Sequence, residues 1–256
     1  MSIQPLPLNQ HIIWLTGASS GIGASLIAAL QSCCQQLIIT ARNEQALLEL
    51  AQPYQNVSVK AADITNEQQL QIVAAEIGAQ FGRIDTVIAN AGTCEYVDVN
   101  QFDSALFRRV IAPNFMGLIY TVAAALPWLR KSQRGYLVGT SSSVTWLAMP
   151  RAQAYGASKA AMRHFLEAMR ADLWHEHIDV SIISPGFIAT PLTDKNDFPM
   201  PFRISAEQAA MAIIKGLEKR TFDIHFPKRF TRLLQLLGAL PTAIKFRITR
   251  AMSRSN

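Results

Sequence analysis

Cysteine is scarce in this 256-residue sequence, with only Cys33, Cys34 and Cys94. Three cysteines do not make a disulfide framework, and no CxxC pair or Cys/His cluster has the spacing of a metal site. We therefore expect no metal centre, and a reducing, cytoplasmic compartment.

Long hydrophobic runs are also lacking. Residues 1–10 contain no positive charge and no long apolar run, so a signal peptide is not expected. By this count no stretch reaches the roughly 18 apolar residues of a membrane span. The longest apolar region, residues 116–129, is interrupted by Thr121 and Pro127, and we interpret it as a buried helix.

Acidic residues are scarce in the last sixth of the chain. Residues 215–256 contain ten Lys/Arg and two acidic residues, a net charge of +8. Residues 1–214 contain fourteen basic and sixteen acidic residues, a net charge of −2. Aromatic residues are sparse among these basic residues and no DNA-binding motif is present, so a nucleic-acid partner is not expected.

What the sequence does contain is a regular alternation of short β-branched runs and longer helical patterns. It predicts a doubly wound parallel sheet in one α/β domain, residues 1–226, with helices on both faces. Ligands of such sheets bind beyond the carboxyl ends of the strands. Strands are expected at 11–15, 36–40, 57–61, 86–89, 135–140, 179–183 and 223–225, and helices at 21–31, 44–51, 66–81, 102–129, 154–174 and 205–219.

A glycine-rich segment, Thr16-Gly17-Ala18-Ser19-Ser20-Gly21-Ile22-Gly23, joins the first strand to the first helix. Glycines there allow a tight turn and let a pyrophosphate approach the backbone N–H groups of the helix N-terminus. The alternative is an ordinary strand-to-helix turn. The nucleotide interpretation assigns cofactor contacts to Gly17, Ser19, Ser20, Gly21, Ile22 and Gly23.

The end of the second strand favours NADP(H) over NAD. It reads Thr40-Ala41-Arg42-Asn43, with no carboxylate to accept hydrogen bonds from a ribose 2′-hydroxyl. The guanidinium of Arg42 has the planar geometry that binds a 2′-phosphate. Arg42 as a solvated surface charge is the alternative.

The third and fourth strands are followed by Asp63-Ile64 and by Asn90-Ala91-Gly92. The Asp63 carboxylate suits an adenine amino group, and the small residues of the second turn would let a cofactor lie against the backbone. Both segments are equally compatible with plain turn chemistry, which also favours Asp, Asn and Gly.

Tyr155 and Lys159 lie four residues apart in the expected helix 154–174, so their side chains share one face. An ammonium beside a phenol favours the phenolate, and we expect the pKa of Tyr155 to be lowered. Tyr155 is then a candidate proton donor and acceptor near neutral pH.

Together these segments resemble the short-chain dehydrogenases/reductases over about residues 12–190. Residues 16–23 resemble the TGxxxGxG loop of that family, 90–92 its NAG motif, and Tyr155 with Lys159 its YxxxK pair. Ser142, thirteen residues before Tyr155, falls at the family's substrate-orienting serine, and Asn114 at the asparagine of its long central helix. The segment Pro185, Gly186, Ile188 and Thr190 resembles the family's PG…T segment around the nicotinamide.

The resemblance implies a Rossmann-type fold and an NADP(H)-dependent oxidoreductase that interconverts a carbonyl and an alcohol. Tyr155 would donate the proton, and Ser142 would bind the carbonyl oxygen. Lys159 would hold the nicotinamide ribose, and Asn114 would help to hold a water of a proton relay. A homodimer or homotetramer is expected. A catalytically silent NADP(H)-binding sensor or scaffold protein is the alternative.

Two features depart from the common family pattern. Pro113 precedes Asn114, where proline removes a helix hydrogen bond and predicts a local break. The second is a basic extension, residues 227–256, with apolar helical patterns at 229–240 and 243–252. Such a segment suits peripheral contact with an anionic membrane surface. The alternative is a helical hairpin packed on the body or on another subunit, with its charges solvated.

The segment 191–204 lies where the family covers its substrate. Its prolines at 191, 199 and 201 argue against regular structure. Apolar side chains there indicate an apolar substrate, although packing within the loop explains them equally well. They are Leu192, Phe198, Met200 and Phe202.

Overall fold

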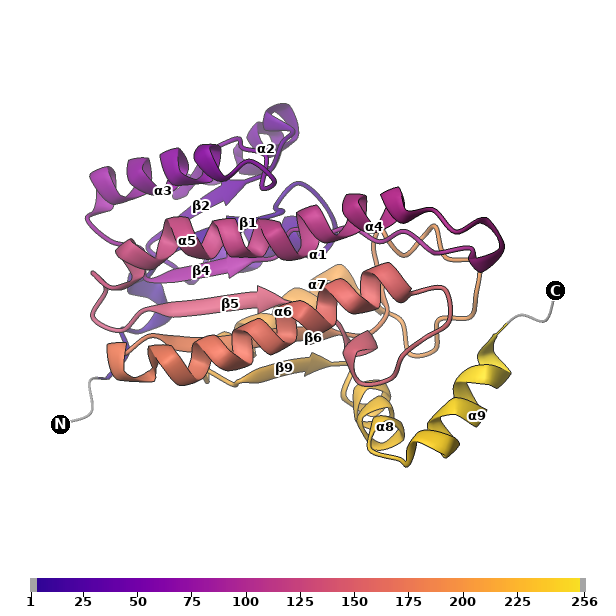
Figure 1. The fold of residues 1–256 in the computed structure, drawn as a ribbon. Coiled ribbons are helices and arrows are strands. Elements are labelled where there is room, and N and C mark those ends of the chain that lie inside the picture. The colour runs from indigo at the N-terminus through magenta and orange to yellow at the C-terminus, as the bar shows by residue number, and fades with distance from the viewer. Residues whose placement is uncertain (1–3, 254–256) are drawn as a thin grey trace.

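The computed structural model describes residues 4–253, so Arg254 of the basic extension lies outside the described residues. Within this range, seven parallel strands form one sheet in the order β3-β2-β1-β4-β5-β6-β9 (Figure 1). A separate parallel pair joins β7 (Ile188–Ala189) to β8 (Ile204–Ser205). The strands of the main sheet are β1 Ile12–Thr16, β2 Gln36–Thr40, β3 Val57–Val59, β4 Thr86–Ala89, β5 Tyr136–Thr140, β6 Asp179–Pro185 and β9 Asp223–Phe226.

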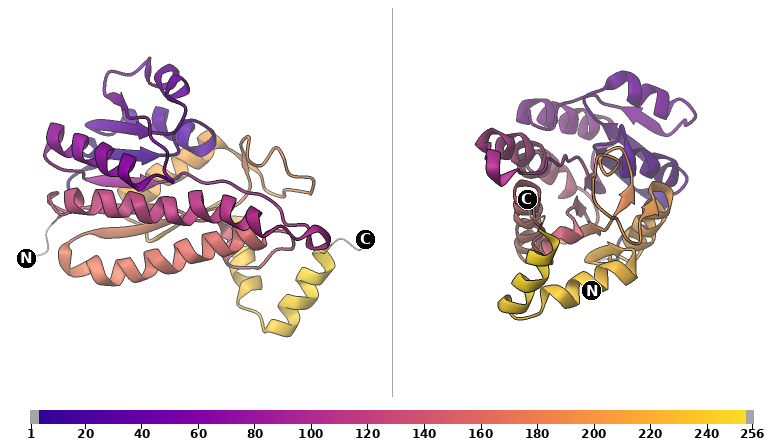
Figure 2. Two further views of the ribbon diagram at one scale, coloured as in Figure 1. Left: turned by 45° about the horizontal axis from the view of Figure 1, so that its top comes forward. Right: turned by 90° about the vertical axis from the view of Figure 1, so that its right-hand side faces the viewer.

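Helices cover both faces of the sheet, which confirms the predicted doubly wound architecture (Figure 2). Alternate side chains of β1 enter the two cores, Ile13 and Leu15 on one face and Ile12 and Trp14 on the other. Because β1 is buried on both faces, it does not alternate apolar and polar residues, and this explains its continuous apolar run. The first core is covered by α1 (Gly21–Gln31), α2 (Glu44–Ala51) and α7 (Ala206–Glu218), and the second by α3 (Glu67–Phe81), α5 (Gly117–Leu129) and α6 (Gln153–Asp172).

The predicted helix 102–129 is wrong in its first two residues and is divided into two helices. It begins as α4 (Ser104–Ile111), capped by Asp103, whose side chain accepts from the Ala105 N–H. A π-helical turn, Ala112–Met116, then precedes α5. Pro113 has no N–H to donate to the carbonyl four residues earlier, so the regular α-helical hydrogen bond is missing there. The chain forms a wider π-helical turn at this point instead. The break predicted from Pro113 is therefore present.

The run Ser104–Leu129 is long and apolar enough to cross a membrane by length and composition alone, among residues 4–253. This differs from the expectation that no segment would qualify. Leu118, Val122 and Leu129 of α5 pack in the core beneath the sheet. A core helix of a folded domain passes the same test, and the expected burial of residues 116–129 holds for these side chains.

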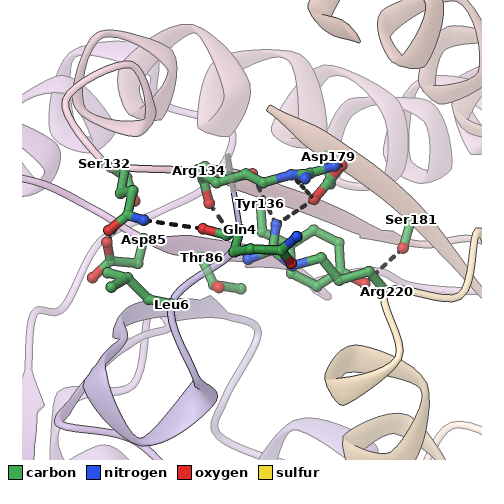
Figure 3. A network of polar contacts seen from close by, with 12 residues as sticks. Gln4, Leu6, Asp85, Thr86, Ser132, Arg134, Tyr136, Asp179, Ser181 and Arg220 are labelled. Carbon is green, nitrogen blue, oxygen red and sulfur yellow. Dashed lines mark hydrogen bonds and ion pairs between the residues drawn. The ribbon is translucent and has the colours of Figure 1, made fainter. Parts of the chain in front are cut away.

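A polar network covers the amino-terminal end of the sheet (Figure 3). The Asp85 carboxylate, 0% exposed, accepts from the Ile12 N–H at 2.8 Å and from Ser132 Oγ at 2.6 Å, and it pairs with Arg83. Asp179 pairs with two guanidinium groups, those of Arg134 at 2.8 Å and Arg220 at 2.5 Å.

Two further buried side chains extend this network. The Tyr136 hydroxyl is 2.7 Å from Ser181 Oγ, and Ser181 donates to the Thr221 carbonyl at 2.8 Å. His11 Nδ1 lies 2.8 Å from Thr86 Oγ1, and its Nε2 lies 3.0 Å from the carbonyl oxygen of Leu6. Burial of the ring lowers the pKa of His11.

The chain ends in two helices, α8 (Lys228–Gly238) and α9 (Thr242–Met252), at the end of the molecule toward which the strands point (Figures 1 and 2). Phe230 and Leu234 of α8 are buried against Leu147, with Phe187 beside them. No residue of α9 is buried. Both helices lie within about two residues of the predicted ranges, and only α8 is packed into the body.

Candidate active site

A cavity of about 710 Å³ opens at the carboxyl ends of the strands. Its volume falls within the roughly 300–1,000 Å³ usual for ligand pockets. All but two of the predicted site residues line it. Those that do are Gly17, Ser19, Ser20, Gly21, Ile22, Arg42, Asn43, Asp63, Ile64, Asn90, Ala91, Gly92, Ser142, Tyr155, Lys159, Pro185, Gly186, Ile188 and Thr190.

The glycine-rich loop forms one wall through close backbone approaches. Gly17 has a φ of +68° and Gly21 a φ of +55°, a region that favours glycine. A Cβ on Gly17 would lie 2.4 Å from the Cα of Ala91, and one on Gly21 would lie 3.1 Å from the Cγ2 of Thr190. The loop therefore touches the segments after β4 and β6 and exposes backbone N–H groups at the start of α1.

Gly23, one of the two predicted residues outside the lining, fits beneath this loop. A Cβ there would lie 2.1 Å from the carbonyl oxygen of Gly17. Its role is close packing of α1 against the turn, as expected for the last glycine of such a loop.

Asn90 joins three strand ends. Its Nδ2 donates to the Gly17 carbonyl at 3.2 Å, and its Oδ1 accepts from Thr140 Oγ1 at 3.2 Å. Its backbone N–H donates to Thr16 Oγ1 at 3.3 Å. The side chain thus serves to hold the loops after β1, β4 and β5 together.

Arg42 lies exposed at the end of β2 and forms no ion pair within residues 4–253. The next residue, Asn43, caps α2 by accepting from the Ala46 N–H at 3.1 Å. Asp63 Oδ1 accepts from the N–H and the hydroxyl of Thr65, at 2.9 and 2.8 Å. Asn43 and Asp63 thus have local structural partners, whereas the Arg42 guanidinium remains available to an anion.

Ser142, Tyr155 and Lys159 meet on the inner wall of the cavity. The Ser142 side chain hydrogen-bonds the Tyr155 hydroxyl and accepts from the Val144 N–H at 3.2 Å. Lys159 Nζ donates to the Thr140 carbonyl at 2.8 Å and lies 5.8 Å from the centre of the Tyr155 ring. The spacing prediction of a shared face is therefore correct.

The predicted direction of the Tyr155 pKa is wrong. Burial raises the pKa of Tyr155 to about 12, although the hydrogen bond from Ser142 opposes the shift. Burial also lowers the pKa of Lys159 to about 8. The ammonium is bonded to the Thr140 carbonyl instead of the phenol, so desolvation outweighs charge attraction. Tyr155 is consequently protonated near neutral pH.

Asn114 is the second predicted residue outside the cavity lining. It is buried in the π-helical turn, where its Oδ1 accepts from the Thr93 N–H at 2.7 Å. Its Nδ2 donates to the Thr93 carbonyl at 2.9 Å and to Ser158 Oγ at 2.8 Å. A Cβ on Gly92 would lie 3.1 Å from both Asn114 Oδ1 and Lys159 Nζ. The amide thus ties residue 93 to α6 beside Lys159.

Several residues near the site carry no motif and were missed. Glu95 and Arg109 line the cavity and pair at 2.8 Å. The thiol of Cys94 interacts electrostatically with Lys159, and burial raises its pKa to about 11. Tyr96 donates to Asn196 Oδ1 at 2.7 Å. Cys94, Glu95 and Tyr96 follow β4 in an irregular segment, where no periodicity indicates which side chains turn inward, whereas Arg109 lies in α4.

Segment 191–204 contacts its neighbours through aromatic rings, although most of its residues are exposed. The Phe198 ring lies 5.7 Å from that of Tyr96, and the Phe202 ring lies 6.2 Å from that of Phe230. Of the four apolar residues noted in the sequence, Leu192 lines the cavity. Phe198 and Phe202 thus have aromatic neighbours, while Leu192 and Phe202 stay 37% and 53% exposed.

A family model and a known relative each match most of this chain. The family model for short chain dehydrogenase matches residues 11–199. The 11-beta-hydroxysteroid dehydrogenase 1A of Arabidopsis thaliana is 36% identical over 199 residues, which are 75% of this chain and 56% of that protein. The chain thus spans little more than half the length of this relative.

Two solved structures share the fold. A short chain dehydrogenase from Burkholderia cenocepacia J2315 in complex with NADP is 24% identical, with a TM-score of 0.83 over 95% of this chain and 99% of that one. A short chain dehydrogenase/reductase from Burkholderia phymatum in complex with NAD is 20% identical, with a TM-score of 0.81 over 90% and 94%. With the match over residues 11–199, the chain belongs to the short-chain dehydrogenase family of oxidoreductases.

Proposed function

We propose that the protein is an NADP(H)-dependent oxidoreductase that interconverts a carbonyl and an alcohol. The observation that carries the proposal is the meeting of Ser142, Tyr155 and Lys159 on the wall of a cavity bordered by the glycine-rich loop. The glycine-rich loop supports a pyrophosphate site, because it leads into the N-terminus of α1 and Gly17 packs too closely on Ala91 to carry a Cβ. When bound, the nicotinamide supplies the hydride.

In this proposal Tyr155 donates a proton to the carbonyl oxygen. Its raised pKa keeps the hydroxyl protonated near pH 7, which is the form that reduction requires. Ser142 donates a hydrogen bond to the same oxygen and stabilises its developing charge. Lys159 binds the cofactor ribose, and its charge persists below a pKa of about 8.

Asn114 is a positioning residue in this proposal. Its amide holds residue 93 and Ser158 together next to Lys159, so it maintains the wall on which Lys159 lies. A proton relay from Lys159 through a water near Asn114 stays a prediction.

The catalytic proposal is tested with a panel of ketones, aldehydes and alcohols, with NADPH absorbance as the readout. Tyr155→Phe removes the donated proton and should lower turnover by roughly 10²–10⁴-fold while NADPH still binds. Tyr136→Phe, at the opposite end of the sheet, is the matched control and should keep its turnover. Unchanged turnover in Tyr155→Phe would remove the proposed mechanism. NADPH binding without turnover on any substrate would favour the silent sensor or scaffold.

We propose NADP(H) as the preferred cofactor. The two structural neighbours hold NADP and NAD, so they support a nicotinamide cofactor and leave the preference to this chain's own residues. Support comes from Arg42, an exposed cavity-lining guanidinium without an ion pair in the described part of the chain. Its fork geometry suits the 2′-phosphate.

Arg42→Ala tests the cofactor preference. A hydrogen bond from a charged donor contributes about 1.5–3 kcal/mol, so its loss should weaken NADPH binding roughly 10- to 100-fold. The affinity for NADH should stay nearly unchanged. Arg108→Ala, an exposed arginine outside the cavity lining, is the control. Equal losses for the two cofactors in titrations followed by fluorescence would refute the preference.

The substrate we propose is an apolar small molecule. Support comes from Leu192 in the cavity lining and from the hydroxysteroid dehydrogenase name of the Arabidopsis relative. We also propose a homodimer or homotetramer in the cytoplasm.

A further inference from the structure

All charged side chains of α8 and α9 are basic. Residues 227–253 contain six basic residues and no acidic residue, and within residues 4–253 none of the six forms an ion pair. They are Lys228, Arg229, Arg232, Lys245, Arg247 and Arg250. Lys228 interacts electrostatically with Asp223, a carboxylate that is already paired with Arg163. The surface therefore keeps a net positive charge, which attracts anions over a distance of about one Debye length, near 8–10 Å.

Large apolar side chains are exposed between these charges. Leu236 of α8 is 69% exposed and Phe246 of α9 is 63% exposed. Arg229, Leu233 and Leu236 recur at helical spacing, and Arg250 follows Phe246 by four residues, so apolar and basic side chains share each outward face. Leu233, Ile244 and Met252 are exposed as well.

The inward face of α8 is already occupied. Phe230 and Leu234 are buried against Leu147, and a Cβ on Gly238 would lie 2.2 Å from the Trp146 carbonyl oxygen. This packing anchors the hairpin to the body. Because α9 has no buried residue, its apolar side chains contribute nothing to the core within the described chain.

The hairpin lies at the same end of the molecule as the cavity (Figures 1 and 2). Val99 and Phe102, in the segment before α4, are 68% and 63% exposed at that end. The segment that contains these exposed apolar residues thus lies at the same end of the molecule as the basic helices.

We propose that the outward face of α8 and α9 binds an anionic lipid surface, with Leu236 and Phe246 entering the headgroup boundary. Interfacial helices combine such apolar side chains with Lys and Arg on the same face. A second copy of this chain fits less well, because its hairpin would bring six like charges into contact. The inference goes beyond the proposed oxidoreductase activity and does not depend on it.

Cosedimentation of the full chain with vesicles tests this inference. Vesicles of phosphatidylcholine with 30% phosphatidylglycerol should bind the protein, pure phosphatidylcholine should bind it weakly, and high salt should weaken the binding. The double variant Leu236→Ser/Phe246→Ser and the double variant Arg247→Glu/Arg250→Glu should each lower partitioning about tenfold or more.

Matched controls remove equivalent groups elsewhere. Trp174→Ser removes a side chain that is 62% exposed on another surface, and Lys215→Glu/Lys219→Glu makes the same change in net charge on α7. Both should bind vesicles like the parent protein, and circular dichroism should show all variants folded. Tyr155→Phe should also bind, which separates this inference from the catalytic proposal.

The inference is overturned if either double variant binds as well as its control. It is also overturned if the Leu236/Phe246 variant changes the oligomeric mass in light scattering without changing vesicle binding. That second outcome would make the hairpin an interface between copies of the chain.

Discussion

The two ends of the sheet use similar polar side chains in opposite ways. At the amino-terminal end, Asp85 bonds to Ile12 and Ser132, and Asp179 is held between Arg134 and Arg220 (Figure 3). At the carboxyl-terminal end, the Arg42 guanidinium has no ion-pair partner among residues 4–253, and the Tyr155 hydroxyl borders a cavity.

The difference teaches how to separate a structural polar cluster from a functional one. Buried polar groups that satisfy one another stabilise the fold, because an unpaired buried group is costly. Groups that keep free donors toward a cavity leave their bonding capacity for a ligand. Tyr136 and Tyr155 illustrate this, since burial raises the pKa of each to about 12, yet only Tyr155 lines the cavity.

After the Tyr155 and Tyr136 variants, the largest effect that distinguishes the two ends should come from a serine pair. Ser142→Ala removes the proposed donor to the carbonyl oxygen and should lower turnover roughly 10²–10³-fold with little loss of stability. Ser181→Ala leaves the Tyr136 hydroxyl without its partner. The free energy of unfolding, measured in urea, should therefore fall by about 1–3 kcal/mol while turnover is retained. A turnover loss in Ser181→Ala, or none in Ser142→Ala, would break the comparison.

A comparable effect on stability alone is expected at Asp85. Asp85→Ala removes the acceptor of the Ile12 N–H and of Ser132 Oγ, both buried or half-buried groups. We expect a loss of about 3 kcal/mol in the free energy of unfolding. Its ion pair with Arg83 adds little to this figure, because the Arg83 side chain is 33% exposed.

Urea unfolding with intrinsic fluorescence measures this loss, and Asp85→Asn, which keeps one acceptor oxygen, should recover part of it. The NADPH affinity of both variants should match the parent protein. A changed affinity would mean that the two ends of the sheet are coupled.

The smallest effect should be a dependence of stability on pH through His11. Burial lowers the pKa of the His11 ring below 6.5, and the positive charges of Arg220 and Arg83 lower it further. The hydrogen bond to the Leu6 carbonyl and the charge of Asp85 raise this pKa and so oppose part of the shift. The unfolded chain therefore binds a proton first as the pH falls. Stability that is fully present above pH 6.5 should decrease below it.

Urea midpoints at pH 7.5 and pH 5.5 would measure this dependence, with His11→Gln as the comparison. His225, whose pKa is also lowered by burial, contributes in the same direction to both proteins. The change in urea midpoint between the two pH values, compared between the parent protein and His11→Gln, isolates the contribution of His11. Equal changes in the two proteins would exclude this contribution.

Much of the fold was predictable from local sequence. The apolar run at residues 37–39 predicts a strand buried on both faces, and β2 is such a strand. Pro113 predicts the break that appears as a π-helical turn. These predictions succeed because side-chain sterics and missing N–H groups act within a few residues of the chain.

Parts of the site could not be predicted. The spacing of Tyr155 and Lys159 indicates a shared face, yet the direction of the Tyr155 pKa depended on burial of the phenol. The Lys159 ammonium bonds to the Thr140 carbonyl, which no spacing indicates. Glu95 and Arg109 come together across fourteen residues without any motif. Phe198 and Phe202 pack on rings from other segments.

The sequence by itself determined the order of strands and helices, the glycine-rich turn and the candidates Ser142, Tyr155 and Lys159, because each depends on local conformation and fixed spacing. Only the tertiary structure decided which polar groups bond to each other and which face the cavity. The same is true of α8 and α9, which share a basic composition although only α8 is packed. Burial and partner choice arise between distant segments, so no local pattern contains them.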